Sequence, residues 1–132
     1  MSDKNKEIVE KANALNAEGK SDEFLLLFAE DAEWTLLADA PIITKGREAI
    51  RAFMASSSPE GSEPPKFTVD NLIAEGDLVV ANGDMTMKSK EGETVPYAYC
   101  DIYRIQDDKI AELRTFINKT QADTTKESSA AA

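Results

Sequence analysis

The spacing of apolar residues changes across residues 56–65, from a helical repeat before this segment to a two-residue alternation after it. In the first part, Ile8, Val9, Ala12 and Leu15 recur three or four positions apart, as on one face of a helix. The segment itself reads SSSPEGSEPP, a polar, proline-rich connector. Helices first and a run of alternating strands last is typical of an α+β domain, in which the helices collect on one face of a curved, mainly antiparallel sheet.

Local signals divide both parts into elements. Gly19 ends the first helix, Ser21 is expected to cap the second, and Gly46 opens the third. The predicted helices span residues 4–18, 21–28 and 46–55, and the predicted strands span residues 33–37, 67–73, 78–89, 94–106 and 110–118. A loop carrying Pro41 joins the first strand to the third helix. The turns at 76–77 and 106–109 and the join at 90–93 are short and polar enough for hairpins. Residues 1–119 therefore form one expected domain, and residues 120–132 an expected frayed tail.

Composition excludes several classes of function. The chain has no histidine and a single cysteine, which removes Ser-His-Asp and Cys-His nucleophile pairs, histidine-ligated metals and cysteine zinc cages. We therefore expect neither a metal nor another cofactor. The net charge of −10 disfavours nucleic acid as a partner. The longest apolar run, residues 24–29, is far shorter than the roughly 20 residues that span a bilayer. With no signal peptide visible, we expect a cytoplasmic protein that does not bind membranes.

Three segments and the distances between them resemble the nuclear transport factor 2-like superfamily, most closely its ketosteroid isomerases and SnoaL-like polyketide cyclases. They are residues 28–34 (FAEDAEW), residues 44–50 (TKGREAI), and the pair 99–105 (YCDIYRI) and 108–114 (DKIAELR). The resemblance covers roughly residues 8–118. It implies a cystatin-like, cone-shaped fold, with a mixed, mainly antiparallel sheet wrapped around the N-terminal helices. This fold hosts enzymes, binding modules and oligomerisation domains, so it does not identify an activity.

The ketosteroid isomerase mechanism combines a carboxylate base with a tyrosine and a protonated aspartic acid that bind the oxyanion. The resemblance places the aspartic acid at Asp101. It places the base at Leu36 and the tyrosine at Ala12, neither of which has the required group. The resemblance therefore implies a related pocket and argues against ketosteroid isomerisation by that mechanism.

Asp101 is the first candidate catalytic residue. Strand alternation puts it on one face with Tyr97, Tyr99 and Tyr103, where lost hydration would raise its pKa. Tyr99 is the preferred partner. A structural aspartate, and tyrosines that only pack, are the competing interpretations.

A replacement base is sought at two positions. Asp39 lies three residues beyond Leu36, close to the expected pocket mouth, where a loop bend would turn it inward. Asp84 would pair with Asp101 if its face of the strand is the inner one, and is a surface residue otherwise. For both, a solvated carboxylate is the simpler interpretation.

The remaining candidates are apolar or weakly polar residues expected to line the pocket. The set is Trp34, Leu36, Phe53, Met54, Tyr97, Leu113, Thr115 and Ile117, the last three by resemblance. Core packing is the ordinary role of such residues, and a small hydrophobic molecule is the ligand that this lining would bind.

Three functions remain open. One is an acid/base enzyme (an isomerase, cyclase or lyase) acting on a small hydrophobic carbonyl compound, with Asp101 at its centre. The second is a noncatalytic ligand-binding domain. The third is a partner-binding or oligomerisation module that uses the outer sheet face. The superfamily resemblance implies a homodimer under all three.

Overall fold

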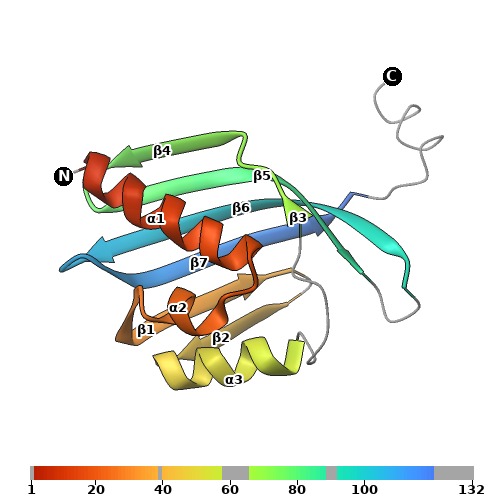
Figure 1. Ribbon diagram of the computed structural model, residues 1–132, viewed down its shortest axis with the longest axis horizontal. Coiled ribbons are helices and arrows are strands. Elements are labelled where there is room, and N and C mark those ends of the chain that lie inside the picture. The colour runs from red at the N-terminus through yellow and green to blue at the C-terminus, as the bar shows by residue number, and fades with distance from the viewer. Residues whose placement is uncertain (1, 39, 58–65, 89–91, 121–132) are drawn as a thin grey trace.

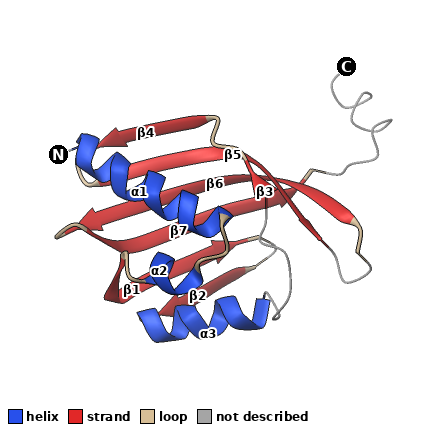
Figure 2. Ribbon diagram, in the orientation of Figure 1, coloured by secondary structure: helices blue, strands red, loops and turns tan. Residues whose placement is uncertain are grey.

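The computed structural model describes residues 2–38, 40–57, 66–88 and 92–120 (Figures 1 and 2). Three helices and seven strands follow one another along these residues. They are α1 (Ser2–Ala17), α2 (Ser21–Leu25), β1 (Phe28–Leu37), β2 (Pro41–Lys45), α3 (Arg47–Ser57), β3 (Lys66–Phe67), β4 (Asn71–Glu75), β5 (Leu78–Lys88), β6 (Thr94–Gln106) and β7 (Lys109–Lys119).

All strands belong to one sheet in the order β2-β1-β7-β6-β5-β3, with β4 also paired to β5. The β1–β7 pair is parallel and the others are antiparallel, so the sheet is mixed and mainly antiparallel, as expected. Figure 1 shows the three helices on the same side of the curved, unclosed sheet. The predicted α+β class is therefore confirmed, and the sheet has an inner face toward the helices and an outer face away from them.

The helices pack through a continuous apolar core. Val9 and Ala12 of α1, Ile50 of α3 and Phe28 of β1 are almost completely buried. Burying one such large side chain contributes about 1.5–3 kcal/mol. The rings of Phe24 and Phe28 meet edge to face at 5.1 Å, which fixes α2 against the start of β1.

Two predicted boundaries near the second helix are wrong. Ser21 is the first residue of α2, and the N-cap is Lys20, with no side-chain capping bond. The helix ends at Leu25, because Phe28 already pairs with Ile110 in β7 and begins a strand five residues earlier than expected. Tertiary pairing therefore overrides the helical spacing of these residues.

The loop expected around Pro41 is instead the edge strand β2. Its register with β1 runs from Pro41 opposite Leu37 to Lys45 opposite Glu33. Proline is tolerated at the first position of an edge strand, where it removes no ladder bond.

The strand predicted over residues 67–73 is divided into β3 and β4. Phe67 lies opposite Met85, and Asn71 lies opposite Asn82. The segment therefore advances four residues where β5 advances three. Such a one-residue excess is a bulge, which shifts the alternation. The predicted turn at 106–109 is confirmed, with Asp107 and Asp108 at φ 52° and 63°.

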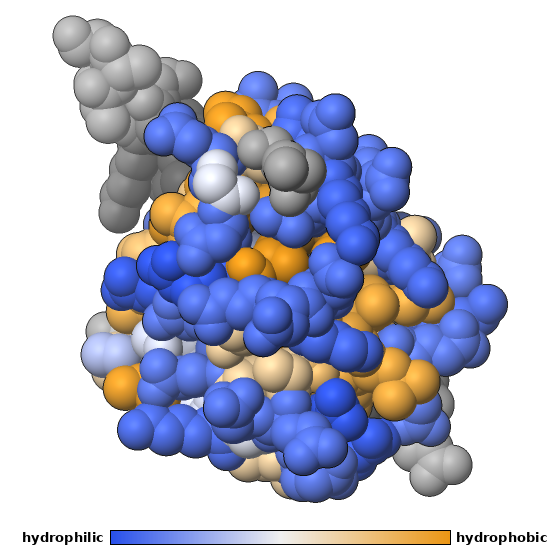
Figure 3. Space-filling model, turned by 90° about the vertical axis from the view of Figure 1, so that its left-hand side faces the viewer, coloured by the Kyte–Doolittle hydropathy of each residue, from blue (hydrophilic) through white to orange (hydrophobic). Residues whose placement is uncertain are grey.

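Residues 58–65 of the connector, 89–91 of one predicted join and 121–132 of the predicted tail lie outside the described residues. Within the described part of the chain, no helix is long and apolar enough to cross a membrane. Figure 3 views the left-hand end of Figure 1 and shows a mainly hydrophilic surface with separate apolar patches, consistent with the net charge of −10.

Candidate functional site

Asp101 lies at the centre of a row of side chains across the inner face of the sheet. Antiparallel register places it between Ala81 of β5 and Thr115 of β7, and Thr115 lies beside Leu36 of β1. Paired residues in neighbouring strands project from the same face. The row therefore brings Asp101 together with Leu36 and Thr115, two of the residues predicted to share its pocket.

The Asp101 side chain is partly buried, and its environment makes the carboxyl harder to ionise than in water. Burial raises its pKa to about 6, while hydrogen bonds from Thr115 and Tyr103 lower it. Hydroxyl donors stabilise the carboxylate, so lost hydration is the larger effect. At pH 7 the group is mainly ionised, yet close enough to its pKa to take up and return a proton.

The nearest tyrosine hydroxyl to Asp101 in the hydrogen-bond network is that of Tyr103. Its Oη lies 3.5 Å from Asp101 Oδ2 and 3.4 Å from Asn13 Oδ1 of α1. Tyr103 has one proton for these two acceptors, and burial raises its pKa well above the usual range. When Asp101 is neutral and donates, Tyr103 can direct its proton to Asn13.

Tyr99, the predicted partner of Asp101, directs its hydroxyl elsewhere. Tyr99 Oη donates to the carbonyl oxygen of Thr68 over 2.5 Å, and its ring meets Phe67 edge to face at 6.1 Å. Burial, with the nearby charge of Asp101 second, raises the pKa of Tyr99 to about 12. In this structure the hydroxyl fastens the segment between β3 and β4.

The candidate bases do not join the row. Asp84 is exposed and lies opposite Ala98 on the outer face, so the pairing of Asp84 with Asp101 is ruled out and the surface interpretation holds. Asp39 lies outside the described residues. Leu36 and the fully buried Ala12 stand at the positions where the resemblance expects the base and the oxyanion tyrosine.

Several predicted lining residues lie around the row. Trp34 and Phe53 form an edge-to-face pair at 5.3 Å, and Trp34 and Met54 pack against the core. Leu113 is buried opposite Tyr103, Ile117 lies opposite Tyr99, and Tyr97 opposite Met85. Alternation along β5–β7 places these side chains on the inner face with Asp101.

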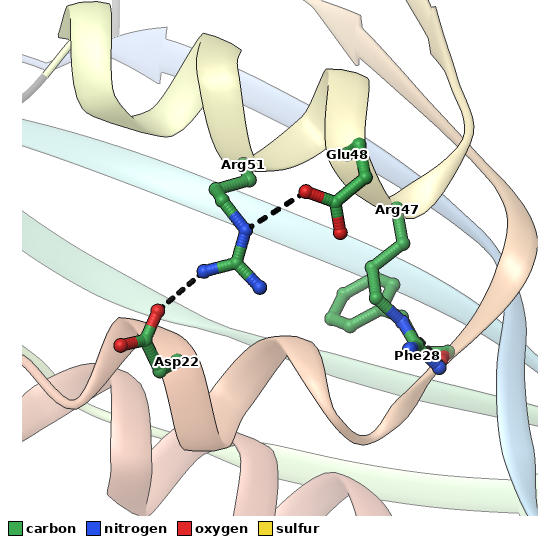
Figure 4. A network of polar contacts seen from close by, with 5 residues as sticks. All are labelled: Asp22, Phe28, Arg47, Glu48 and Arg51. Carbon is green, nitrogen blue, oxygen red and sulfur yellow. Dashed lines mark hydrogen bonds and ion pairs between the residues drawn. The ribbon is translucent and has the colours of Figure 1, made fainter.

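Helix α3, which carries Phe53 and Met54, is attached to its neighbours through two arginines (Figure 4). Arg47 donates to the carbonyl oxygen of Phe28 over 2.6 Å, and Arg51 bridges Asp22 of α2 and Glu48. The Arg51 ion pairs are exposed and contribute little energy. The Arg47 bond reaches a main-chain oxygen of β1 and so ties the first residue of α3 to that strand.

Asn13 is a site residue that the sequence did not single out. It follows Ala12 in α1, and nothing in the local pattern distinguishes it from other polar residues of the helix. Its proximity to Tyr103 arises only when α1 packs against the sheet at β4 and β5. Among the described residues, no group of three or more histidine, cysteine, aspartate or glutamate side chains is arranged to hold a metal ion.

Comparison with known proteins identifies one matching family and several solved structures of similar fold. The family model described as SnoaL-like domain matches residues 9–113. A putative SnoaL-like polyketide cyclase from Shewanella putrefaciens is similar, with 15% identity, TM-score 0.75, and coverage of 95% of this chain and 83% of that one. A putative ketosteroid isomerase from Kribbella flavida has 17% identity, TM-score 0.73, and coverage of 92% and 81%.

A nuclear transport factor 2-like protein of unknown function from Cytophaga hutchinsonii has 23% identity and TM-score 0.67, with coverage of 85% of this chain and 97% of that one. At these identities the likeness shows a shared fold. No protein with curated annotation matches the chain.

Proposed function

The chain belongs to the SnoaL-like domain family, and from that premise we propose that its inner sheet face binds a small, largely apolar carbonyl compound with which Asp101 exchanges a proton. The observation that carries this proposal is a half-buried carboxyl with a pKa of about 6, beside two hydroxyl donors on an otherwise apolar face. Catalytic carboxylates are often shifted toward neutrality in this way.

The proposed reaction has two proton transfers. Ionised Asp101 removes a proton from the carbon next to the carbonyl group, and the electron pair moves to the carbonyl oxygen to give an enolate or enol. Neutral Asp101 then returns the proton to the same carbon or to a conjugated one. Because Leu36 replaces the base expected from the resemblance, Asp101 performs both steps in this proposal.

The lining supports the class of ligand. Trp34 and Phe53 form an aromatic pair, and Leu36 lies beside Thr115 in the same inner-face row as Asp101. Apolar walls with few polar groups are typical of sites for small hydrophobic molecules. Proton transfer to and from a carboxyl group requires no metal.

The test uses 2-tetralone, an apolar ketone with acidic carbon-bound protons. Its exchange with D2O is followed by proton NMR at several pH values. We expect wild-type protein to accelerate exchange, with a rate that rises through about pH 6 as Asp101 ionises. Asp101→Asn should lower the acceleration by about 100-fold or more. Asp84→Asn, on the outer face, is the matched control and should retain it.

A second measurement separates Tyr99 from Asp101. Because the Tyr99 hydroxyl donates to Thr68, we expect Tyr99→Phe to retain most of the exchange activity while losing folding stability. Equal activity of wild type and Asp101→Asn would contradict the enzymatic proposal. If 2-tetralone shifts the Trp34 indole signal but its protons are not exchanged, the noncatalytic binding function is supported instead. The absence of the expected base at Leu36 and of the expected tyrosine at Ala12 would agree with that result.

We also propose that the outer face joins two copies of the chain. Ile43, Ile73 and Phe116 are 59%, 63% and 37% exposed, values that are high for large apolar residues. Register carries one outer-face row across six strands, in the order Ile43, Thr35, Arg114, Ile102, Val80 and Ile73.

A further inference from the structure

The indole group of Trp34 is connected to Asp101 through Thr115. Trp34 Nε1 donates to Thr115 Oγ1 over 2.9 Å. Trp34 lies beside Leu113 in the parallel β1–β7 pair, two residues before Thr115, and Thr115 lies opposite Asp101. Three adjacent strands thus present indole, hydroxyl and carboxyl groups in sequence on the inner face.

The direction of these hydrogen bonds is determined by chemistry. An indole N–H can only donate, so Thr115 Oγ1 must be the acceptor. The hydroxyl then retains its own proton to donate, and Asp101 is the carboxyl to which Thr115 is hydrogen-bonded. A donor that also accepts a hydrogen bond is polarised and donates more strongly.

The indole direction is fixed by packing that does not involve Asp101. The Phe53 ring of α3 meets the indole at 5.3 Å and an interplanar angle of 84°. Trp34 is half-buried and packs against the core, and Arg47 ties α3 to β1. The packing of the indole ring therefore holds its N–H group toward Thr115, whatever the charge of Asp101.

We propose that Trp34 is a positioning residue, which acts through Thr115 to orient and strengthen the hydrogen bond to the Asp101 carboxylate. Its meaning for catalysis rests on the proposed function, since it concerns the same acid/base group. Its effect on Asp101, however, is measurable in the free protein without any substrate.

The other groups around Asp101 leave this effect measurable. Tyr99, Cys100 and Tyr103 are titratable neighbours on β6, and burial raises the pKa of each above its usual value, well above neutrality. Asn13 from α1 and Ala81 from β5 carry no charge. Between pH 4 and pH 8 the titration near Thr115 is therefore that of Asp101.

A hydrogen bond to the charged form of an acid lowers its pKa, so removing the bond raises it. We expect Thr115→Val, which keeps the shape but removes the hydroxyl, to raise the pKa of Asp101 by about one unit. Trp34→Phe keeps an aromatic ring but removes the N–H, and should raise it by a few tenths of a unit. In the Thr115→Val background, Trp34→Phe should cause no further rise.

The experiment is a carbon-13 NMR titration of the Asp101 carboxyl in wild type, the two single variants and the double variant. Thr115→Ser, which retains a hydroxyl, is the control and should keep a pKa near that of wild type. Two results would overturn the proposal: pKa shifts of Asp101 that simply add in the double variant, or an unchanged Asp101 pKa in Trp34→Phe. Additive shifts would mean that Trp34 affects Asp101 without acting through Thr115.

A measurement on wild-type protein covers the case in which Trp34→Phe does not fold. The chain has one tryptophan, so its indole N–H gives a single identifiable NMR cross-peak. We expect this peak to titrate with the Asp101 midpoint and to lose that titration in Thr115→Val. A peak position that does not change as Asp101 titrates would contradict the proposed action of Trp34 on Asp101 through Thr115.

These outcomes are distinguishable from failure of the proposed function. If wild-type protein does not exchange 2-tetralone protons while the Asp101 pKa shifts occur as expected, the positioning role of Trp34 is supported and the catalytic proposal fails. If exchange occurs and depends on Asp101 but the shifts are absent, the catalytic proposal stands and Trp34 has a packing role.

Discussion

At the scale of single residues, the pKa of Asp101 depends on two opposing effects, burial and hydrogen bonding. Thr115 and Tyr103 donate to its carboxyl, but the cost of lost hydration is larger and the pKa rises to about 6. The Tyr103 bonds to Asp101 and Asn13, at 3.5 and 3.4 Å, lie at the long limit of hydrogen bonding. The Trp34–Thr115 bond, at 2.9 Å, is shorter than both Tyr103 bonds.

The raised pKa predicts how Asp101 affects stability. The folded state, with a pKa of about 6, binds the proton more tightly than the unfolded chain, near 3.8. Its stabilising effect is thus fully present below about pH 4 and is lost as the pH rises through about 6. Relative to Asp101→Asn, wild type should lose on the order of 2 kcal/mol of unfolding free energy between pH 4 and pH 7.

Urea unfolding of wild type and Asp101→Asn across this pH range measures the difference. Asp84→Asn, an exposed substitution on the outer face, serves as the reference for surface charge. A gap between wild type and Asp101→Asn that stays constant with pH would mean that the Asp101 carboxyl is not desolvated in the folded protein.

At the scale of elements, the segment between β3 and β4 is held against β5 and β6 by hydrogen bonds. Thr68 and Asp70 donate their main-chain N–H groups to Asp84 and Asn82, and Tyr99 donates to the carbonyl oxygen of Thr68. Gly83 allows this close approach, since a Cβ there would lie 2.2 Å from that same oxygen. The segment is therefore built around a glycine and a tyrosine from two other strands.

Substitution of Gly83 tests the close approach of the Thr68 main chain to β5. Gly83→Ala forces main-chain atoms apart, because the obstructing atom belongs to the backbone and cannot rotate away. We expect a loss of about 1–3 kcal/mol in unfolding free energy. Hydrogen exchange should show lost protection at the amides of Thr68 and Asp70, while the amide of Ile110, which bonds to Leu27, keeps its protection. Uniform loss across all of these amides would instead indicate general destabilisation.

At the scale of the whole molecule, the two faces of the sheet divide the proposed roles. The inner face holds Asp101 and its apolar neighbours beneath the helices, and the outer face carries exposed Ile43, Ile73 and Phe116. Arg114 stacks over Phe116 at 5.5 Å on that outer face. An apolar surface on a chain of net charge −10 is suited to self-association, because a charged surface would repel its copy.

The proposed dimer is tested by sedimentation velocity at several protein concentrations. We expect wild type to sediment as a dimer and Phe116→Glu to shift it toward monomer, since the substitution places like charges on both copies of the face. Ala14→Glu, with the same charge change on an exposed position of α1, should leave the mass unchanged. A monomeric wild type would contradict the outer-face proposal without affecting the inner-face site.

Local sequence patterns determined the α+β class, the three helices, the three long strands at the C-terminal end and the face on which Asp101 lies. Strand alternation acts between residues two positions apart, so the grouping of Asp101 with Tyr99 and Tyr103 could be inferred along β6 alone. The same local pattern could not determine that Phe28 and residues 41–45 form strands, since their partners lie on separate elements.

Only the tertiary structure decided what each polar group binds. Trp34 and Thr115 are 81 positions apart, Tyr103 and Asn13 are 90, and Tyr99 and Thr68 are 31. Sequence reasoning therefore chose Tyr99 as the partner of Asp101 and gave Trp34 a lining role, whereas the fold directs Tyr99 to Thr68 and Trp34 to Thr115. The physical reason is that alternation specifies a face of the sheet, while a hydrogen bond requires atoms from different strands to meet within about 3 Å, which depends on register and packing.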